Sequence, residues 1–260
     1  MEISFYKYQG TGNDFVILDN RKKTYDGLTT AQVKFLCDRR FGIGADGLML
    51  LNLHPDHDFE MKYYNSDGRE STMCGNGGRC LTKFANDMGM AQTTYRFLAI
   101  DGPHESSINT DGTVALKMND VSNIRYEHGN FILNTGSPHF VIMASDVMHL
   151  DVYKKGHDIR YSPAFREEGI NVNFVEQTEE PDQIIVRTYE RGVENETLSC
   201  GTGVTAAALV CSHNDNGFNR VEVKTKGGQL SVEYEKSGNQ YTQVWLNGPA
   251  ERVFEGKIRL

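Results

Sequence analysis

The segment STMCGNGGRC, residues 71–80, places a cysteine directly before a Gly-x-Gly turn and a stretch with helical spacing. A second segment, LSCGTGVTAA at residues 198–207, has the same arrangement. Each stretch carries apolar residues at i, i+3, i+4 and i+7, namely Leu81, Phe84, Ala85 and Met88 in the first and Val204, Ala207, Ala208 and Cys211 in the second. This spacing predicts two helices, one beginning at Cys74 and the other at Cys200.

The two cysteine segments belong to a longer internal repeat. Cys200 lies 126 residues after Cys74, and the same shift pairs five glycines with five others: Gly10 with Gly136, Gly75 with Gly201, Gly77 with Gly203, Gly102 with Gly228, and Gly112 with Gly238. Turns often need glycine because it adopts backbone angles that other residues avoid. Five matches in one register therefore indicate duplicated architecture rather than chance alignment of turn residues. We predict an α+β protein with two similar lobes, residues 1–117 and 118–248, and expect segment 249–260 to return to the first lobe.

Strand-like segments surround both helices. In the first half we expect two strands around a Gly-rich turn, a helix capped by Thr29 with a basic last turn, further strands and a hairpin, over residues 2–20, 29–40, 47–52, 58–65, 94–100 and 110–112. The second half repeats the order, with strands over residues 131–144, 170–177, 183–192 and 219–246.

Composition and charge exclude several classes of protein. Of 260 residues, 38% are hydrophobic and 24% are charged, as in globular proteins, and no run approaches 18 apolar residues, so no membrane partner is expected. The net charge of −8 argues against nucleic acid as a partner. The first ten residues lack the features of a secretory signal. With an odd count of five cysteines, these features predict free thiols in the cytoplasm.

A cysteine at a helix start has a specific chemistry. The unpaired N–H groups and the helix dipole stabilise its thiolate, so the thiol pKa falls below the free value of about 8.5. The following glycines let backbone N–H groups approach a bound carboxylate. If the two lobes close on one substrate, a thiolate on one side can remove an α-proton while a thiol on the other side returns one. That arrangement suits inversion of an amino-acid stereocentre, and no feature points to a pyridoxal or any other cofactor.

Other interpretations of the cysteines were weighed. A lone Cys-Gly-x-Gly is a weak signal, because an isolated cysteine is usually a buried, inert residue. Cys37, Cys80 and Cys211 sit on apolar helix positions and are predicted to be core residues. Cys74 and Cys80 stand six apart, and no Cys-x-x-Cys or His-x-x-x-His spacing occurs, so no metal site is predicted.

Taken together, the motifs GTGNDF, FGIGADGL, YNSDGRESTMCGNGGRC, TGSPH, YERGVENETLSCGTG and GPAERVFEGKI resemble the diaminopimelate epimerase family over nearly the whole chain. The resemblance implies a cofactor-independent isomerase that converts LL-2,6-diaminopimelate to the meso form, for lysine and peptidoglycan synthesis. It also implies two pseudo-symmetric lobes, each a β-sheet or barrel around a central helix, and a homodimer.

The resemblance also assigns roles to individual residues. The family's catalytic cysteines fall on Cys74 and Cys200. Its substrate-binding positions fall on Asn13, Asn65, Gly75, Asn76, Asn171, Glu190, Arg191, Gly201 and Thr202. His139 matches a histidine that helps to poise a thiol, although a histidine before a strand is also explained by a structural role.

Two of these assignments leave questions open. Glu190 and Arg191 could form a surface ion pair instead of holding the far end of a substrate. Some family members carry Gln where Gly47 stands and Asn where Ser137 stands, which affects substrate contacts and leaves the proton chemistry unchanged. Nothing in the repeat tells which cysteine acts as the base in the LL direction.

Two other functions compete with the epimerase. A proline or hydroxyproline racemase of the same fold also pairs two cysteines at Gly-rich helix starts, but lacks the polar set for a second amino-acid head: Asn65, Asn171, Glu190 and Arg191. A non-catalytic thiol-redox or small-molecule binding protein could keep the fold as well. Loss of activity with retained binding, after replacement of either cysteine, would exclude that alternative.

Overall fold

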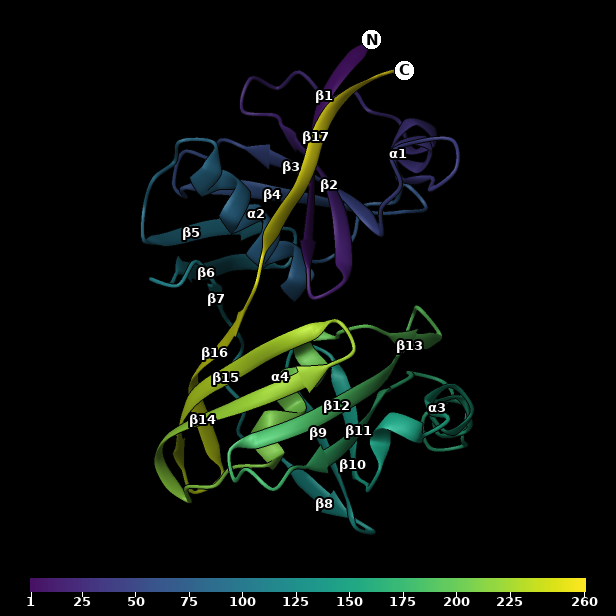
Figure 1. The fold of residues 1–260 in the computed structure, drawn as a ribbon, viewed down its shortest axis with the longest axis vertical. Coiled ribbons are helices and arrows are strands. Elements are labelled where there is room, and N and C mark those ends of the chain that lie inside the picture. Colours follow the sequence, from purple (N-terminus) through teal and green to yellow (C-terminus); the bar gives the residue numbers. More distant parts are fainter. The chain divides into compact units, whose positions relative to one another are not determined.

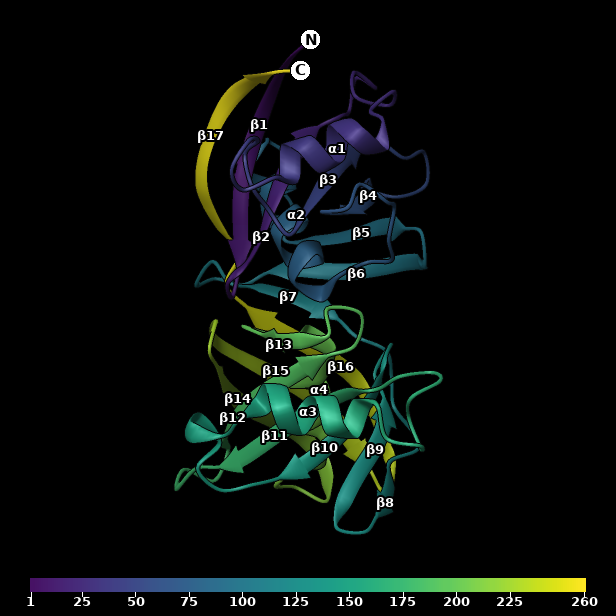
Figure 2. The same ribbon diagram turned by 90° about the vertical axis from the view of Figure 1, so that its right-hand side faces the viewer.

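The computed structural model describes residues 1–260, and the chain divides into two compact units. Unit 1 comprises Met1–Leu116 and Gly248–Leu260, and unit 2 comprises Lys117–Asn247. Each unit has a sheet that surrounds one helix, which confirms the predicted α+β fold with a central helix in each lobe (Figures 1 and 2). None of the helices combines the length and the apolar character needed to span a membrane.

Unit 1 is built from eight strands and two helices. Its sheet runs β17–β1–β2–β3–β4–β5–β6–β7, with parallel pairs at β2–β3 and β4–β5 and antiparallel pairs elsewhere. The bounds are β1 Glu2–Gly10, β2 Asn13–Asp19, α1 Thr30–Cys37, β3 Gly47–Asn52, β4 Phe59–Asn65, α2 Gly75–Asp87, β5 Thr94–Ala99, β6 Gly102–Ile108, β7 Val114–Lys117 and β17 Glu251–Arg259.

Unit 2 repeats this order of strands and pairings. Its sheet runs β8–β9–β10–β11–β12–β14–β15–β16, with parallel pairs at β10–β11 and β12–β14, and β13 lies beside β12. The bounds are β8 Arg125–Glu127, β9 Asn130–Asn134, β10 Pro138–Met143, the 3-10 helix η1 Val147–His149, α3 Val152–Arg160, β11 Asn171–Gln177, β12 Gln183–Glu190, β13 Asn195–Thr197, α4 Gly201–Val210, β14 Asn216–Thr225, β15 Gly228–Ser237 and β16 Gln240–Gly248.

The repeat of 126 residues is visible in the backbone itself. Gly102 pairs with Ala99 at the β5–β6 turn, and Gly228 pairs with Thr225 at the β14–β15 turn, with φ of 122° and 142°. Only glycine adopts such angles without strain. The pair Gly10 and Gly136 differs, because Gly136 has φ of 108° while Gly10 ends strand β1 without a positive φ. That match in the sequence therefore reflects two different backbone roles.

The central helices α2 and α4 are enclosed by strands. Helix α2 contacts β1, β2, β3, β6 and β17, and α4 contacts β9, β10, β11, β12, β14 and β15. Both helices are rich in glycine, alanine and threonine, which are small enough to let strands pack on every side. Glycine weakens an isolated helix, so these helices depend on the surrounding sheet for their stability.

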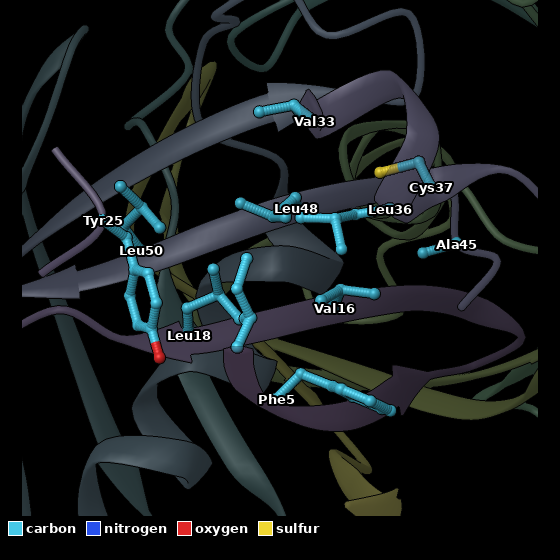
Figure 3. Packing of buried hydrophobic residues seen from close by; sticks show 11 residues of the cluster. Phe5, Val16, Leu18, Tyr25, Val33, Leu36, Cys37, Ala45, Leu48 and Leu50 are labelled. Atoms are coloured by element: carbon cyan, nitrogen blue, oxygen red, sulfur yellow. The ribbon is translucent and has the colours of Figure 1, made fainter. Parts of the chain in front are cut away.

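A second core in unit 1 lies between the sheet and α1, around Val16, Leu36 and Leu48 (Figure 3). Helix α1 begins with a capping box in which Thr29 and Gln32 satisfy each other's backbone N–H groups. The expected helix over residues 29–40 was too long, because α1 ends at Cys37. Arg39, placed by sequence in a basic last turn, instead binds acidic side chains described below.

Helix α3 had no counterpart among the sequence-based predictions. Asp151 caps its start by accepting a hydrogen bond from the Lys154 N–H at 3.0 Å. Gly156 in its middle weakened the helical pattern, yet this glycine allows close packing. A Cβ atom at Gly156 would lie 2.3 Å from Cβ of Tyr189, so only glycine lets α3 approach strand β12 so closely.

Candidate active site

Cys74 is the N-cap residue of helix α2, in an extended conformation with φ of −99° and ψ of 129°. Its side chain makes no capping hydrogen bond, although cysteine stands where serine or aspartate usually caps. The N–H groups of the first turn, on Gly75, Asn76 and Gly77, are therefore not occupied by a cap from Cys74. An anion beside the thiol can accept hydrogen bonds from them.

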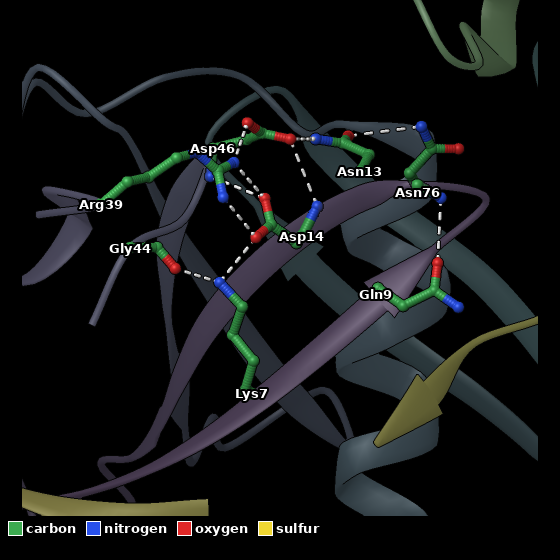
Figure 4. Close-up of polar contacts among 9 residues, drawn as sticks. Lys7, Gln9, Asn13, Asp14, Arg39, Gly44, Asp46 and Asn76 are labelled. Carbon is green, nitrogen blue, oxygen red and sulfur yellow. Dashed lines mark hydrogen bonds and ion pairs between the residues drawn. The ribbon is translucent and has the colours of Figure 1, made fainter. Parts of the chain in front are cut away.

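Asn13 contacts the Cys74 thiol in unit 1, and Asn76 contacts the same oxygen of Asn13. The thiol donates to Oδ1 of Asn13 at 3.4 Å, and Nδ2 of Asn76 donates to the same oxygen at 3.3 Å. Nδ2 of Asn13 donates to Oδ2 of Asp46 at 2.6 Å (Figure 4). Because a carboxylate only accepts, Asp46 fixes the amide of Asn13 with its oxygen facing Cys74.

An ion-pair cluster supports Asp46 (Figure 4). Arg39 contacts Oδ1 of Asp46 at 2.7 Å and both oxygens of Asp14 at 2.9 and 2.6 Å, while Lys7 contacts Asp14 at 2.7 Å. Burial alone would raise the pKa of Asp14, but the hydrogen bonds from Arg39 and Lys7 hold it well below its usual range. The start of β2, which carries Asn13, is thus held in place by this ion-pair cluster.

Asn65 and Gly47 lie opposite each other on β4 and β3, next to this cluster, because Gly47 follows Asp46 and the Ser66 N–H donates to the Asp46 carbonyl at 3.1 Å. The Asn65 side chain is exposed and contacts none of the other predicted site residues of unit 1. A Cβ atom at Gly47 would lie 2.4 Å from Cε2 of Tyr63, so the Tyr63 ring fills the space of a side chain there. The glutamine of some family members would not fit at this position without displacing Tyr63.

Cys200 is the N-cap residue of α4 in unit 2, with φ of −113° and ψ of 110° and no capping hydrogen bond. Its sulfur lies 3.5 Å from Oγ1 of Thr202. The carbonyl of Thr202 accepts from Oγ1 of Thr135 at 2.9 Å, which ties the start of α4 to the loop after β9. The local backbone therefore matches that of Cys74, with different side chains around the sulfur.

A second polar group in unit 2 joins Ser137, Asn171 and Arg191. Nδ2 of Asn171 donates to Oγ of Ser137 at 2.9 Å, and Oδ1 of Asn171 accepts from the Arg191 N–H at 2.8 Å. The Arg191 guanidinium donates to Ser137 at 3.3 Å and to the Glu168 carbonyl at 2.9 Å. The guanidinium is exposed and makes no ion pair, so the alternative of a surface pair with Glu190 does not occur. Serine at residue 137 still serves as a hydrogen-bond partner.

Glu190 lies at the end of β12 and accepts a hydrogen bond from Oγ1 of Thr197 on β13 at 2.8 Å. The neighbouring Arg191 points into the Ser137–Asn171 group instead. Two consecutive residues at the end of one strand thus reach different partners, as expected from the alternation of side chains along a strand.

His139 on β10 is fully buried and neutral. Burial lowers its pKa to about 3, aided by the positive charge of Arg191 and opposed by a hydrogen bond with Asn173. Oδ1 of Asn173 accepts from Thr188 at 2.9 Å, so Nδ2 of Asn173 donates to Nδ1 of His139 at 3.0 Å. The proton of the neutral ring is therefore on Nε2, which has no hydrogen-bond partner.

The other three cysteines are buried core residues, as the sequence predicted. Burial raises the pKa to about 12 for Cys37 and Cys80 and to about 11 for Cys211. These thiols stay protonated at neutral pH and are poor nucleophiles. Five free cysteines therefore divide into three inert ones and the two at helix starts.

Within unit 1 the structure brings together Cys74, Gly75, Asn76 and Asn13, and Asn65 ends strand β4 opposite Gly47. Within unit 2 it groups Asn171 with Arg191 and Cys200 with Gly201 and Thr202. Sequence reasoning missed Asp46, Asn173 and Thr188. A signal existed for Asn173, because INVNF places two asparagines at alternate positions of an otherwise apolar strand. Polar residues repeated on one face of a buried strand need partners and often mark a site.

Comparisons with known proteins agree on one family. The family model "Diaminopimelate epimerase" matches residues 5–124 and 131–253. The chain is 48% identical to the diaminopimelate epimerase of Flavobacterium psychrophilum over 98% of this chain and 100% of the relative. It is 42% identical to that of Chlorobaculum tepidum, over 96% of this chain and 99% of the relative.

Solved structures share the fold at much lower sequence identity. A phenazine biosynthesis protein of the PhzF family from Bacillus anthracis covers 100% of both chains with a TM-score of 0.77 at 14% identity. A hydroxyproline epimerase from Agrobacterium vitis, with bound trans-4-hydroxy-L-proline, covers 99% of this chain and 92% of its own with a TM-score of 0.66 at 13% identity. At such identities the likeness concerns the fold alone.

Proposed function

Because the chain belongs to the diaminopimelate epimerase family, a family of isomerases, we propose that it interconverts LL-2,6-diaminopimelate and meso-diaminopimelate. The observation that carries the proposal is the pair of N-cap cysteines, Cys74 and Cys200, each at a helix start without a capping bond. A thiol at such a position can ionise near neutral pH, whereas the three core thiols stay protonated there because burial raises their pKa.

The proposed chemistry is a two-base proton transfer without a cofactor. The thiolate of one cysteine takes the α-proton, which leaves a carbanion whose charge spreads into the α-carboxylate and turns that sulfur into a thiol. The thiol of the other cysteine gives its proton to the opposite face of the α-carbon and becomes the thiolate. The enzyme then holds the same charges as before with the roles of the sulfurs exchanged, as a reversible epimerisation requires.

The helix starts would bind the reacting carboxylate. In this proposal the N–H groups of Gly75 and Asn76 on α2, and of Gly201 and Thr202 on α4, donate to its oxygens. Negative charge grows on those oxygens when the α-proton leaves, so these donors stabilise the transition state more than the ground state.

The polar groups away from the sulfurs would hold the distal end of the substrate. Arg191 is exposed and without an ion pair, and can take the far carboxylate in a bidentate contact. Glu190 can accept from the distal ammonium, and the amides of Asn13, Asn65 and Asn171 supply further donors and acceptors. His139, neutral with its proton on Nε2, would act as a donor that poises a thiol.

The remaining features of the proposal concern the setting. We propose that the two compact units are the duplicated lobes of this enzyme and that it works as a homodimer in the cytoplasm. The five free cysteines fit a reducing compartment. The product and substrate belong to lysine and peptidoglycan synthesis.

The test is proton NMR of the reduced protein in deuterated water, with LL-diaminopimelate in one tube and L-proline in another. The proposal expects deuterium at the α-carbon of diaminopimelate, together with the meso isomer and without added cofactor. Exchange in proline alone would assign the chain to the racemase alternative. A lack of exchange in both tubes would refute thiol-based epimerisation and leave a binding protein of this fold.

A further inference from the structure

Helix α2 contains an arginine that the proposed mechanism does not use. Arg79 is fully buried, with 0% of its surface exposed, and is the largest fully buried side chain in the chain. Removing a guanidinium from water is costly unless another charge or a full set of hydrogen bonds compensates it. A buried arginine therefore indicates a compensating group nearby.

The hydrogen bonds of Arg79 do not supply that compensation. Nη2 donates to Oδ1 of Asn76 at 3.0 Å and, weakly, to Oγ1 of Thr11 at 3.4 Å. Nε and Nη1 are buried without a partner, and Arg79 makes no ion pair. The carboxylates of Asp14 and Asp46, in the cluster beyond Asn13, are already held by Lys7 and Arg39. No carboxylate therefore balances the positive charge of Arg79.

The guanidinium lies beside the first turn of α2, toward Cys74. Helical side chains lean toward the N-terminus of their helix, and Arg79 reaches back three residues to Asn76. Asn76 in turn donates to Oδ1 of Asn13, the oxygen that also faces the Cys74 sulfur (Figure 4 shows the two asparagines). A chain of polar contacts of 3.0, 3.3 and 3.4 Å therefore connects the arginine with the thiol.

Apart from Arg259 on β17, the charged groups on the surrounding elements make ion pairs or hydrogen bonds of their own. Strand β3 carries no charged or titratable side chain. The charged and titratable groups on the other elements that contact α2, and on α2 itself, are Glu2, Tyr6, Lys7 and Tyr8 on β1, Asp14 and Asp19 on β2, His104 and Glu105 on β6, Glu251, Arg252, Glu255, Lys257 and Arg259 on β17, and Lys83 and Asp87 on α2. Within unit 1, burial lowers the pKa of Arg79, and negative charge on Cys80 or Cys74 raises it. Cys80 stays neutral because burial raises its pKa to about 12. Cys74 is only partly buried and is left as the group that can carry the charge.

We propose that Arg79 is the buried counter-charge of the Cys74 thiolate. The residue is a positioning residue, because a side chain with no exposed surface does not touch a substrate. The repeat gives unit 2 no such cation: the residue 126 positions later is Thr205, whose hydroxyl donates to the carbonyl of Gly201 at 3.0 Å. Cys74 is therefore the sulfur that ionises first in the free protein, and within the proposed epimerase it is the resident base.

The experiment measures alkylation of each cysteine by iodoacetamide as a function of pH, without substrate, with the Cys74 and Cys200 peptides quantified separately by mass spectrometry. The variants are Arg79→Met, which removes the charge with little change of volume, and Arg79→Lys, which keeps it. Thr205→Val is the matched control at the equivalent position of unit 2. Melting curves identify folded variants, and Arg79→Gln replaces Arg79→Met if the latter does not fold.

The proposal expects the midpoint of the Cys74 profile to rise by about one pH unit in Arg79→Met, with alkylation at neutral pH about tenfold slower. Arg79→Lys should restore most of the rate, and the Cys200 profile should stay unchanged in every variant. An unchanged Cys74 profile in folded Arg79→Met, or equal shifts at both cysteines, would overturn it. Because no substrate is involved, this result is independent of whether diaminopimelate is epimerised.

Discussion

The two N-cap cysteines share a backbone and differ in everything around it. Residues related by the shift of 126 stand at equivalent places: Asn13 and His139 on β2 and β10, Gly47 and Asn173 on β3 and β11, Asn65 at the end of β4 and Arg191 just after β12, Asn76 and Thr202 in the first turns, and Arg79 and Thr205 inside the helices. The helix starts are alike in the two units, at a place where the geometry is demanding. The side chains near each sulfur differ, so two similar thiols have different electrostatic surroundings.

The difference matters because the proposed reaction needs unlike partners. At any moment one sulfur must be a thiolate and the other a thiol, and two identical environments would not favour either assignment. Unit 1 places a buried cation near Cys74, whereas the residues at matching or neighbouring places in unit 2, Thr205, Asn173 and the neutral His139, carry no charge. The different side chains around the two sulfurs therefore favour one assignment of thiolate and thiol, which the matching backbones alone would not.

The largest expected effect follows from removal of either sulfur. Cys74→Ala and Cys200→Ala should each lower turnover by about 10²–10⁴-fold, the usual contribution of a general acid or base, while the fold survives. Each single variant should still exchange the α-proton of one stereoisomer without inverting it, because one sulfur remains. NMR in deuterated water measures both events.

Cys211→Ala serves as the control for the cysteine variants. This thiol is buried with its pKa raised to about 11, so its loss should leave turnover unchanged. Near-normal turnover in either Cys74→Ala or Cys200→Ala would contradict the two-base mechanism. Retained exchange of both stereoisomers in one variant would contradict it as well.

A second comparison concerns the paired glycines Gly77 and Gly203, in the first turns of α2 and α4. A Cβ atom at Gly203 would lie 2.3 Å from Oδ1 of Asn173, whereas one at Gly77 would lie 3.2 Å from the flexible Met49 side chain. Gly203→Ala should destabilise the protein by about 1–3 kcal/mol through overpacking. Gly77→Ala should be within about 0.5 kcal/mol of wild type, since alanine's helix propensity offsets the contact.

Thermal and urea unfolding of the two glycine variants would measure this difference. Gly203→Ala should also weaken the link between Asn173 and His139, while Gly77→Ala leaves unit 2 untouched. Equal destabilisation by the two substitutions would show that the starts of α2 and α4 are packed alike, against the contacts described here.

The smallest effect is a pH dependence confined to unit 2. The pKa of His139 is lowered to about 3, so between pH 6.5 and 3 an unfolded chain binds a proton there that the folded chain does not. The unfolding free energy should therefore fall as pH drops below 6.5, by at most about 1.4 kcal/mol per pH unit. Asn13, its counterpart in unit 1, does not titrate.

Urea unfolding of wild type and His139→Gln between pH 5 and 7.5 isolates this contribution. The slope of stability against pH should be shallower in the variant, because the difference between the curves belongs to His139. Parallel curves would mean that the histidine is solvated or charged in the folded protein.

The repeat and both helix starts could be predicted from the sequence because glycine and cysteine occur at the same places in both halves and can be recognised from the residue type alone. Gly102 and Gly228 have the same turn role in both units, and α2 and α4 begin one residue after the cysteines. Arg79 could not be recognised in the same way. It stands on the face of α2 opposite Leu81, which a local pattern assigns to solvent, and only the strands around the helix bury it.

The partners of His139 were equally hidden from the sequence. Thr188 meets Asn173 through the β11–β12 register, and Asn173 meets His139 across the β10–β11 pair, so two tertiary pairings decide which nitrogen carries the proton. Helix α3 was missed because Gly156 interrupts its helical pattern. A glycine is needed there because the helix packs closely on Tyr189, which lies 33 residues later in the sequence. Such long-range contacts leave no local signal.

The pairing of β17 with β1 has a consequence for synthesis of the chain on the ribosome. Eight residue pairs join these two strands, from Glu2–Arg259 to Gln9–Glu251. The first 116 residues of unit 1 emerge early, but the strand that covers their edge is translated only after all of unit 2. Unit 2 is one uninterrupted segment and can fold as it appears. Unit 1 is thus the first to be synthesised and the last to be completed, and the edge of β1 stays unpaired until β17 has been translated.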